Sequence, residues 1–156
     1  MTSHIRTAAS LRALAEHPPR VHCITNLAAS SYTANLLLAV GAIPSLSLST
    51  EELASFVGRA NSLCINLGTL DEQRRQAIAV ALDTAKTYAK PWVLDPVLVD
   101  VSSARCRYAQ TLLKHGPTII RGNRAEIQAL AEREDQAAEQ LALAFNAVVA
   151  QTGSVD

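Results

Sequence analysis

Short apolar runs alternate with longer amphipathic stretches along the chain. The runs have the length of buried strands, and the stretches between them carry apolar residues at helical spacing. Strands are expected at residues 21–25, 42–48, 62–67, 91–96, 118–121 and 147–151, and helices at 10–16, 28–40, from 49 onward, 71–88, 104–114, 123–132 and 134–145. This order of elements predicts an α/β fold with a mostly parallel sheet and helices on both faces.

The composition indicates one globular domain over residues 1–156, because 49% of the residues are hydrophobic and only 18% are charged. The formal net charge is zero, so the basic surface that nucleic acids or anionic membranes require is not expected. No apolar stretch approaches the ~20 residues of a membrane span, and residues 1–20 lack the apolar core of a signal peptide. We therefore expect a cytoplasmic protein that acts on a small molecule.

Cysteine and histidine positions do not favour a zinc site. The three cysteines, Cys23, Cys64 and Cys106, are far apart and form no CxxC pair. We interpret them as buried, reduced thiols of a cytosolic protein, with a disulfide or a metal site as the alternative. The four histidines have neither HxxxH nor HxH spacing.

Polar residues follow five of the predicted strands at the point where each strand ends. They are Thr25-Asn26, Asn66 to Thr69, Asp95-Pro96, Arg121 to Asn123 and Thr152-Gly153. Open parallel sheets bind ligands beyond the carboxyl ends of their strands, where these residues would meet. The sequence therefore predicts a polar ligand site along this edge.

Two of these positions carry charges with two interpretations each. Asp95 can face the cleft and hold Mg²⁺, directly or through water. Because it precedes Pro96, it can equally cap an element or form a turn. Arg121 is a fixed cation suited to a phosphate, and its alternative is a surface salt bridge.

Asn123 and Glu126 are three residues apart, so both fall on one face of a helix's first turn. The same pair fits a variant of the capping box, which is the stronger interpretation for this pair alone. Thr152-Gly153 combines a hydroxyl with a glycine backbone, which together can hold a phosphate oxygen. The chain has neither GxxxxGK[ST] nor GxGxxG, so neither a Walker ATPase nor a Rossmann dehydrogenase is indicated.

Six segments, taken in order, carry a more specific pattern. They are Pro19 to Asn26, Thr33 to Pro44, Asn66 to Leu70, Leu94 to Val97, Ile120 to Ile127 and Val148 to Asp156. Together they resemble the hydroxyethylthiazole kinases. The resemblance implies a ribokinase-like fold and a homotrimer with substrate sites at the subunit interfaces. It also implies that ATP and Mg²⁺ are used to phosphorylate the primary alcohol of 4-methyl-5-(2-hydroxyethyl)thiazole in thiamine synthesis.

The resemblance assigns roles to six residues. They are Asn26 and Leu46 for the thiazole, Arg121 and Thr152 for ATP, and Asp95 and Glu126 for Mg²⁺. Leu46 stands where the family usually has methionine, so it keeps an apolar wall but lacks the polarizable thioether.

The chain departs from the family pattern in its loops. Leu36, Leu98 and Asp100 stand where the family has glycine, a residue that lets the backbone approach a ligand closely or take a positive φ. Leu98 and Asp100 are therefore expected to reshape their loop, and Asp100 adds negative charge near the expected triphosphate. Residues 131–147 are shorter than usual and lack the family's glycine-rich loop.

A further departure concerns catalysis. The sequence ends at Asp156, before the Gly-Thr-Gly-Cys segment that forms the family's anion hole. We therefore expect a domain that is incomplete at its C-terminus, no catalytic residue within these residues, and no turnover by the isolated chain.

Three functional hypotheses follow. The main one is a hydroxyethylthiazole kinase, a phosphotransferase with an alcohol acceptor, as part of a longer product or completed by another chain. The second is a catalytically inactive remnant that acts as a thiazole-binding or oligomerisation module. The third, another ribokinase-like small-molecule kinase, is disfavoured by residues 25–26 and 121–123.

Overall fold

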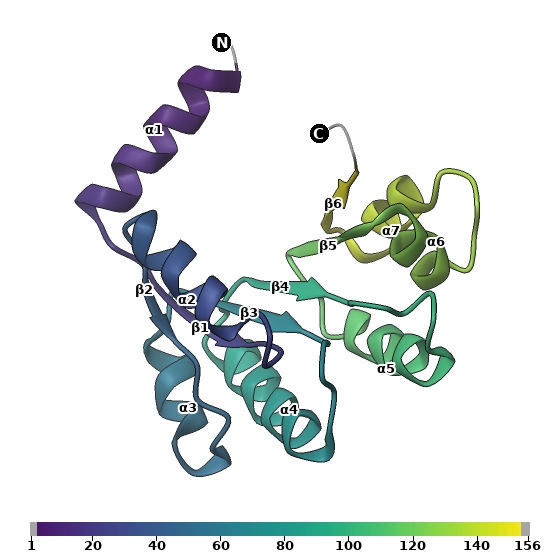
Figure 1. Cartoon of the computed structure of the whole chain (residues 1–156), viewed down its shortest axis with the longest axis horizontal. Helices are drawn as coiled ribbons and strands as arrows, with labels where there is room; N and C mark the ends of the chain where they lie inside the picture. Colours follow the sequence, from purple (N-terminus) through teal and green to yellow (C-terminus); the bar gives the residue numbers. More distant parts are fainter. Residues whose placement is uncertain (1–2, 154–156) are drawn as a thin grey trace.

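The computed structural model of the protein describes residues 3–153 (Figure 1). Six strands in this range form one parallel sheet in the order β2-β1-β3-β4-β5-β6. The strands are β1 (Arg20–Ile24), β2 (Ile43–Ser45), β3 (Ser62–Asn66), β4 (Trp92–Asp95), β5 (Ile119–Asn123) and β6 (Val148–Thr152). The predicted α/β fold is confirmed, and the end of the sixth family-like segment, residues 154–156, lies outside the described range.

Seven helices accompany the strands in the same range. They are α1 (Ser3–Glu16), α2 (Ser30–Ala39), α3 (Thr50–Arg59), α4 (Glu72–Thr87), α5 (Ser103–Leu113), α6 (Arg124–Ala131) and α7 (Ala137–Phe145). Each corresponds to a predicted helix, although α1 starts earlier and α7 later than expected. Strand β2 is shorter than predicted, because it is an edge strand that pairs only with β1. None of the described helices combines the length and apolar character needed to cross a bilayer.

The chain reverses its direction of winding after β2. From β1 it moves outward through α2 to β2, then crosses back to β3 and continues through β4 and β5 to β6. Right-handed crossovers place α2 on the opposite face from α3, α4 and α5. The point between the carboxyl ends of β1 and β3 is therefore the topological switch point, where open α/β sheets bind ligands.

The main core lies between one face of the sheet and the helices α3 to α7, and α3, α4 and α5 can be followed along that side in Figure 1. Alternate strand residues point into it. They are Leu63, Ile65, Trp92, Leu94 and Ile120, each at most 4% exposed. Burial of an aliphatic side chain such as Leu or Ile contributes about 1.5–3 kcal/mol, so this layer holds the strands in register.

The opposite face of the sheet is less covered. Cys64 and Val93 lie side by side on it and are only half-buried. Because side chains alternate along a strand, Asn66, Asp95 and Arg121 point to this same face. A row of polar groups therefore lies at the carboxyl ends of three neighbouring strands.

Candidate active site

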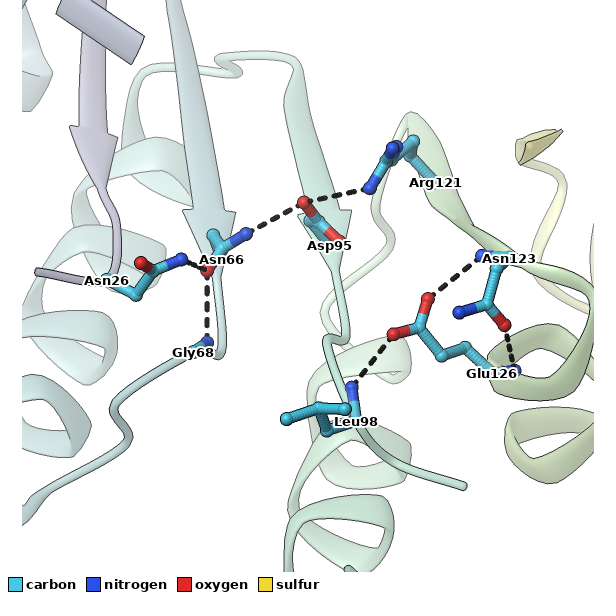
Figure 2. Close-up of polar contacts among 8 residues, drawn as sticks. All are labelled: Asn26, Asn66, Gly68, Asp95, Leu98, Arg121, Asn123 and Glu126. Atoms are coloured by element: carbon cyan, nitrogen blue, oxygen red, sulfur yellow. Dashed lines mark hydrogen bonds and ion pairs between the residues drawn. The ribbon is translucent and has the colours of Figure 1, made fainter. Parts of the chain in front are cut away.

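Two asparagine amides meet at the switch point. Asn26 follows β1, and Asn66 is the last residue of β3. The Nδ2 of Asn26 donates to Oδ1 of Asn66 over 2.9 Å, and the Oδ1 of Asn26 accepts from the backbone N–H of Ala29 over 2.8 Å. The Nδ2 of Asn66 then donates to Oδ2 of Asp95 over 2.8 Å. Figure 2 shows this continuous line of amides running into the carboxylate.

Gly68 keeps this arrangement compact. Its backbone N–H donates to Oδ1 of Asn66 over 3.0 Å. A Cβ added at Gly68 would lie 2.7 Å from the Cβ and 2.8 Å from the Nδ2 of Asn26. Only glycine therefore lets the loop after β3 pass this close to Asn26.

Asp95 ends β4 and lies at the centre of the row. Its Oδ2 accepts from Asn66, while its Oδ1 is buried and has no hydrogen-bond partner. Burial raises the pKa of this carboxyl above its ordinary value and Glu126 adds to the rise, against the opposing effects of the Asn66 amide and of Arg121. A buried carboxylate oxygen without a partner is costly, so this atom is the strongest candidate for contact with a ligand.

Arg121 lies on β5, beside Asp95. One of its terminal nitrogens is 3.5 Å from Oδ2 of Asp95, and its side chain is 49% exposed. The salt bridge that was the alternative interpretation of Arg121 is therefore present, but it is long and solvated. Such a contact leaves most of the guanidinium free to bind another anion.

Glu126 forms the predicted capping box. Its backbone N–H donates to the side chain of Asn123 over 2.9 Å, and its Oε2 accepts from the backbone N–H of Asn123 over 2.9 Å. Its Oε1 accepts from the backbone N–H of Leu98 over 2.8 Å. Glu126 thus ties the loop after β4 to the start of α6 and is itself only 6% exposed.

Leu98 has a backbone φ of 59°, in the left-handed region that favours glycine. This is one of the positions at which the resemblance implies glycine in place of the residue found here. The backbone conformation that glycine would allow is therefore kept by a leucine whose side chain is 51% exposed. Such a conformation costs a non-glycine residue about 1–2 kcal/mol.

Leu46 and Thr152 lie at the two ends of the site. Leu46 follows β2 and is half-buried. Its flanking residues are held by the buried ring of His22, whose Nδ1 lies 2.8 Å from Oγ of Ser45 and whose Nε2 lies 3.1 Å from the carbonyl oxygen of Ser47. Thr152 ends β6 at the other edge, in register with Asn123.

The residues at the centre of the row fit a magnesium site to which the protein supplies only part of the ligands. Mg²⁺ takes oxygen ligands, usually one or two carboxylates together with several waters and substrate phosphates. Oδ1 of Asp95 is such a donor, whereas both oxygens of Glu126 already accept backbone N–H groups. Across residues 3–153, no cluster of three or more His, Cys, Asp or Glu side chains is arranged to hold a metal.

Comparison with known proteins decides the family. A model described as the hydroxyethylthiazole kinase family matches residues 11–156. The chain belongs to this family. A "probable hydroxyethylthiazole kinase" of Agrobacterium fabrum is 43% identical over 130 residues, which cover 83% of this chain and 53% of that protein. A hydroxyethylthiazole kinase of Shigella boydii is 41% identical over 171 residues, covering 100% of this chain and 65% of that protein.

A solved structure agrees with this assignment. The hydroxyethylthiazole kinase protein from Pyrococcus horikoshii superposes with a TM-score of 0.88 at 36% identity, over 94% of this chain and 60% of that one. The chain therefore has the fold of this family and spans between about half and two-thirds of the length of the relatives it matches.

The structure brings together most of the residues expected from the hydroxyethylthiazole kinase pattern. Asn26, Asp95 and Arg121 are linked in one row through Asn66, and Glu126 lies close enough to Asp95 to affect its pKa. Leu46 and Thr152 share the same edge but do not belong to this hydrogen-bonded row.

Sequence reasoning placed Asn66 and Gly68 at a strand end and assigned neither a role. Their contacts depend on the alignment of β1, β3 and β4, whose residues are 29 to 40 positions apart. His22 was not singled out either, although a histidine within an apolar strand is a signal for a buried hydrogen-bonding group.

The three cysteines are free, as expected, but only Cys23 is buried. Cys23 and Cys64 are direct neighbours on β1 and β3. A hydrogen bond between the two thiols raises the pKa of Cys23 and lowers the pKa of Cys64. Cys106 lies apart from them, with its thiol 3.5 Å from the carbonyl oxygen of Ala129.

Proposed function

We propose that this chain binds the thiazole alcohol and the magnesium–nucleotide of a cytoplasmic hydroxyethylthiazole kinase. The reaction transfers the γ-phosphoryl group of ATP to the primary alcohol of 4-methyl-5-(2-hydroxyethyl)thiazole. The alcohol oxygen bonds to the γ-phosphorus, the bond to the bridging oxygen of ADP breaks, and the hydroxyl proton is released. The observation that carries the proposal is the buried, unpartnered Oδ1 of Asp95, which lies between an amide row and a half-exposed guanidinium.

Asn26 and Leu46 form the substrate side of the proposed site. The oxygen of the Asn26 amide already accepts from the backbone N–H of Ala29, and one N–H of its Nδ2 donates to Asn66, so the second N–H is the group that we propose for the ligand. A thiazole ring nitrogen or an alcohol oxygen can accept from it. Leu46 supplies an apolar wall for the ring, and His22 anchors the segment that carries it.

Asp95 and Arg121 form the nucleotide side. Magnesium, when bound, neutralises phosphate charge and orients the γ-phosphoryl group. Asp95 would hold the ion directly or through water, and Arg121 would bind phosphate oxygens with its exposed face. Glu126 would act through its charge and by fixing the loop at Leu98, because its oxygens already accept backbone hydrogen bonds. Thr152 would offer its hydroxyl to a phosphate oxygen.

An exposed apolar surface supports the proposed homo-oligomer, a trimer by family resemblance. It comprises Tyr32 and Leu36, which are one turn apart on the same face of α2 and are 81% and 66% exposed. Leu27, in the loop before α2 and directly after the substrate-side Asn26, is also 71% exposed. Apolar patches of this kind are typical of protein interfaces.

Calorimetry and product analysis test the proposal together. The chain is titrated with the thiazole alcohol, and separately with a non-hydrolysable ATP analogue with and without Mg²⁺. We expect saturable binding of the alcohol and Mg²⁺-dependent binding of the analogue. Absence of both from a folded chain would reject the proposal. Mass spectrometry after incubation with ATP and Mg²⁺ then separates a kinase, which forms the phosphate ester, from a module that only binds.

A further inference from the structure

Asn66 is the side chain that joins the two sides of the site. We propose that Asn66 is a positioning residue that fixes the substrate-facing amide of Asn26 relative to Asp95, so that the thiazole alcohol and the magnesium–nucleotide bind interdependently. The inference rests on the proposed function and adds to it a residue and a form of coupling. Figure 2 shows Asn66 between its two partners.

Backbone donors set the direction of each amide in the row. The Ala29 N–H can only donate, so the Asn26 group facing it must be the oxygen, and the nitrogen of Asn26 must face Asn66. In the same way, the N–H of Gly68 requires Oδ1 of Asn66 on its side. The nitrogen of Asn66 is therefore aimed at Oδ2 of Asp95.

The position requires a side chain that accepts and donates at once. Oδ1 of Asn66 receives two hydrogen bonds, from Asn26 and Gly68, while Nδ2 gives one to Asp95. A primary amide of this length meets the requirement. An aspartate would lose the donor and set one carboxylate against another, and a leucine would lose both functions at nearly the same size.

Close packing makes the row stiff. Gly68 packs directly against the Asn26 side chain, so closely that a Cβ at Gly68 would fall within 3 Å of three Asn26 atoms. Asn26 therefore cannot move towards Gly68. A ligand that binds the Asn26 N–H and shifts this amide also shifts Asn66, and through Asn66 it affects Asp95. A coupling free energy between two sites is reciprocal, so a ligand at Asp95 must act equally on Asn26.

The central experiment compares Asn66→Leu with a matched control, Asn61→Leu. Asn61 also accepts a backbone hydrogen bond, from Arg20 N–H over 2.8 Å, but it precedes β3 at the opposite end of the sheet. The affinity for the thiazole alcohol is measured by calorimetry with and without the Mg²⁺-loaded, non-hydrolysable ATP analogue at saturation.

We expect the analogue to change the alcohol affinity about fivefold or more in the wild type and in Asn61→Leu, the lower end of ordinary allosteric coupling. In Asn66→Leu the two affinities should agree within about twofold, while each ligand alone still binds. Wild-type coupling in Asn66→Leu would overturn the inference. If that variant fails to fold, Asn66→Asp decides, because it keeps the size and the acceptor oxygen and replaces the donor to Asp95 with a second carboxylate.

A ligand-free measurement separates this inference from the proposed function. In nitrogen-15 NMR spectra, Asn66→Leu should shift the side-chain amide signal of Asn26 and speed hydrogen exchange at the Gly68 N–H, whereas Asn61→Leu should do neither. Unchanged Asn26 and Gly68 signals would reject the positioning role. A wild-type chain that shows these effects but binds no thiazole alcohol would reject the proposed function instead.

Discussion

The two ends of the polar row differ in how far they are organised before any ligand binds. At the amide end, Asn26 and Asn66 make hydrogen bonds of 2.8 to 3.0 Å with each other, with two backbone N–H groups and with Asp95. At the cation end, Arg121 has one contact of 3.5 Å to Asp95 and is half-exposed. A rigid ring is bound best by a preorganised pocket, because less ordering is then needed on binding. A flexible triphosphate can be bound by a mobile cation.

The difference follows from position in the sheet. The amide end lies at the switch point between β1 and β3, whereas Arg121 lies on β5, two strands beyond β3 and next to the edge strand β6. Arg121 also has a long, flexible stem, and its fork stays solvated. Variants that affect one end and spare the other can therefore test whether the two ends have separate tasks.

The largest effect is expected at the centre of the row, from Asp95→Ala. Removing the oxygen that would meet Mg²⁺ should weaken Mg²⁺-dependent binding of the ATP analogue on the order of a hundredfold. Binding of the analogue without Mg²⁺ should change little. Calorimetry with and without the metal measures both quantities.

Asp100→Ala is the control, since it removes another carboxylate from the same loop. Asp100 is exposed and lies five residues beyond Asp95. Equal losses in the two variants would mean that loop charge, rather than Asp95, governs the nucleotide affinity.

Gly68→Ala should disturb the amide end of the row more than the cation end. The added methyl group would overlap Asn26 at 2.7 Å, so the amide must move away from its partners. We expect a loss of at least about tenfold in affinity for the thiazole alcohol, because a displaced donor leaves the ligand acceptor unpaired. Affinity for the Mg²⁺-loaded analogue alone should fall less than affinity for the alcohol, because Asn26 reaches Asp95 only through Asn66.

Gly58→Ala serves as its control. A Cβ at Gly58 meets only the ring of Tyr88, at 3.4 Å, which is ordinary contact. If both alanine variants bind the alcohol as the wild type does, the close approach at Gly68 has no part in substrate binding.

Arg121→Gln should weaken nucleotide binding at the cation end with little effect on folding. Loss of a charge-assisted hydrogen bond to phosphate costs about 1.5–3 kcal/mol, which corresponds to roughly ten- to hundredfold in nucleotide affinity at most. The ion pair with Asp95 is solvated, so thermal stability should hardly change.

Arg121→Lys adds a second comparison. Lysine keeps the charge but not the planar fork, so it should recover only part of the affinity if the guanidinium binds phosphate in a bidentate manner. Arg124→Gln, which removes an exposed cation three residues further along, should leave binding unchanged. A loss of the same size in Arg124→Gln would point to general charge attraction.

The sequence predicted the strands of the fold more completely than the hydrogen bonds at the amide end of the row. Short apolar runs located each of the described strands, and the polar residues at the carboxyl ends of β1, β4 and β5 pointed to Asn26, Asp95 and Arg121. These are local signals. The role of Asn66 is not local, because it depends on which strands are neighbours and on their register. Likewise, a pattern of missing glycines could not reveal that Leu98 would keep a left-handed backbone.

Protonation of His22, which holds the residues beside Leu46, should have a smaller, pH-dependent effect on folding stability. Burial lowers the pKa of His22 below its ordinary value, although the hydrogen bond with Ser47 opposes this. The unfolded chain therefore binds a proton at a higher pH than the folded chain does. Stability from this group is present above the unfolded pKa of about 6.5 and is lost as the pH falls towards the folded pKa.

Urea unfolding of wild type and His22→Gln between pH 7.5 and 5.5 measures this contribution. The wild type should lose stability on acidification more steeply than the variant, by up to about 1.4 kcal/mol per pH unit. Parallel pH profiles would assign the acid sensitivity to other groups.

The smallest effect is expected at Leu98, where the loop after β4 meets Glu126. At most positions glycine is less stable than alanine by about 0.5–1 kcal/mol, because it loses more backbone freedom on folding. At a φ of 59° the order should reverse, so Leu98→Gly should be more stable than Leu98→Ala by about 0.5–1 kcal/mol. Comparing these two variants by urea unfolding removes the effect of losing the leucine side chain.

A matched pair at Ala104, in the first turn of α5, should show the ordinary order, with alanine more stable than glycine. Alanine more stable than glycine at both sites would mean that the left-handed conformation of Leu98 carries no strain, and that its leucine needs no compensation from the Glu126 hydrogen bond.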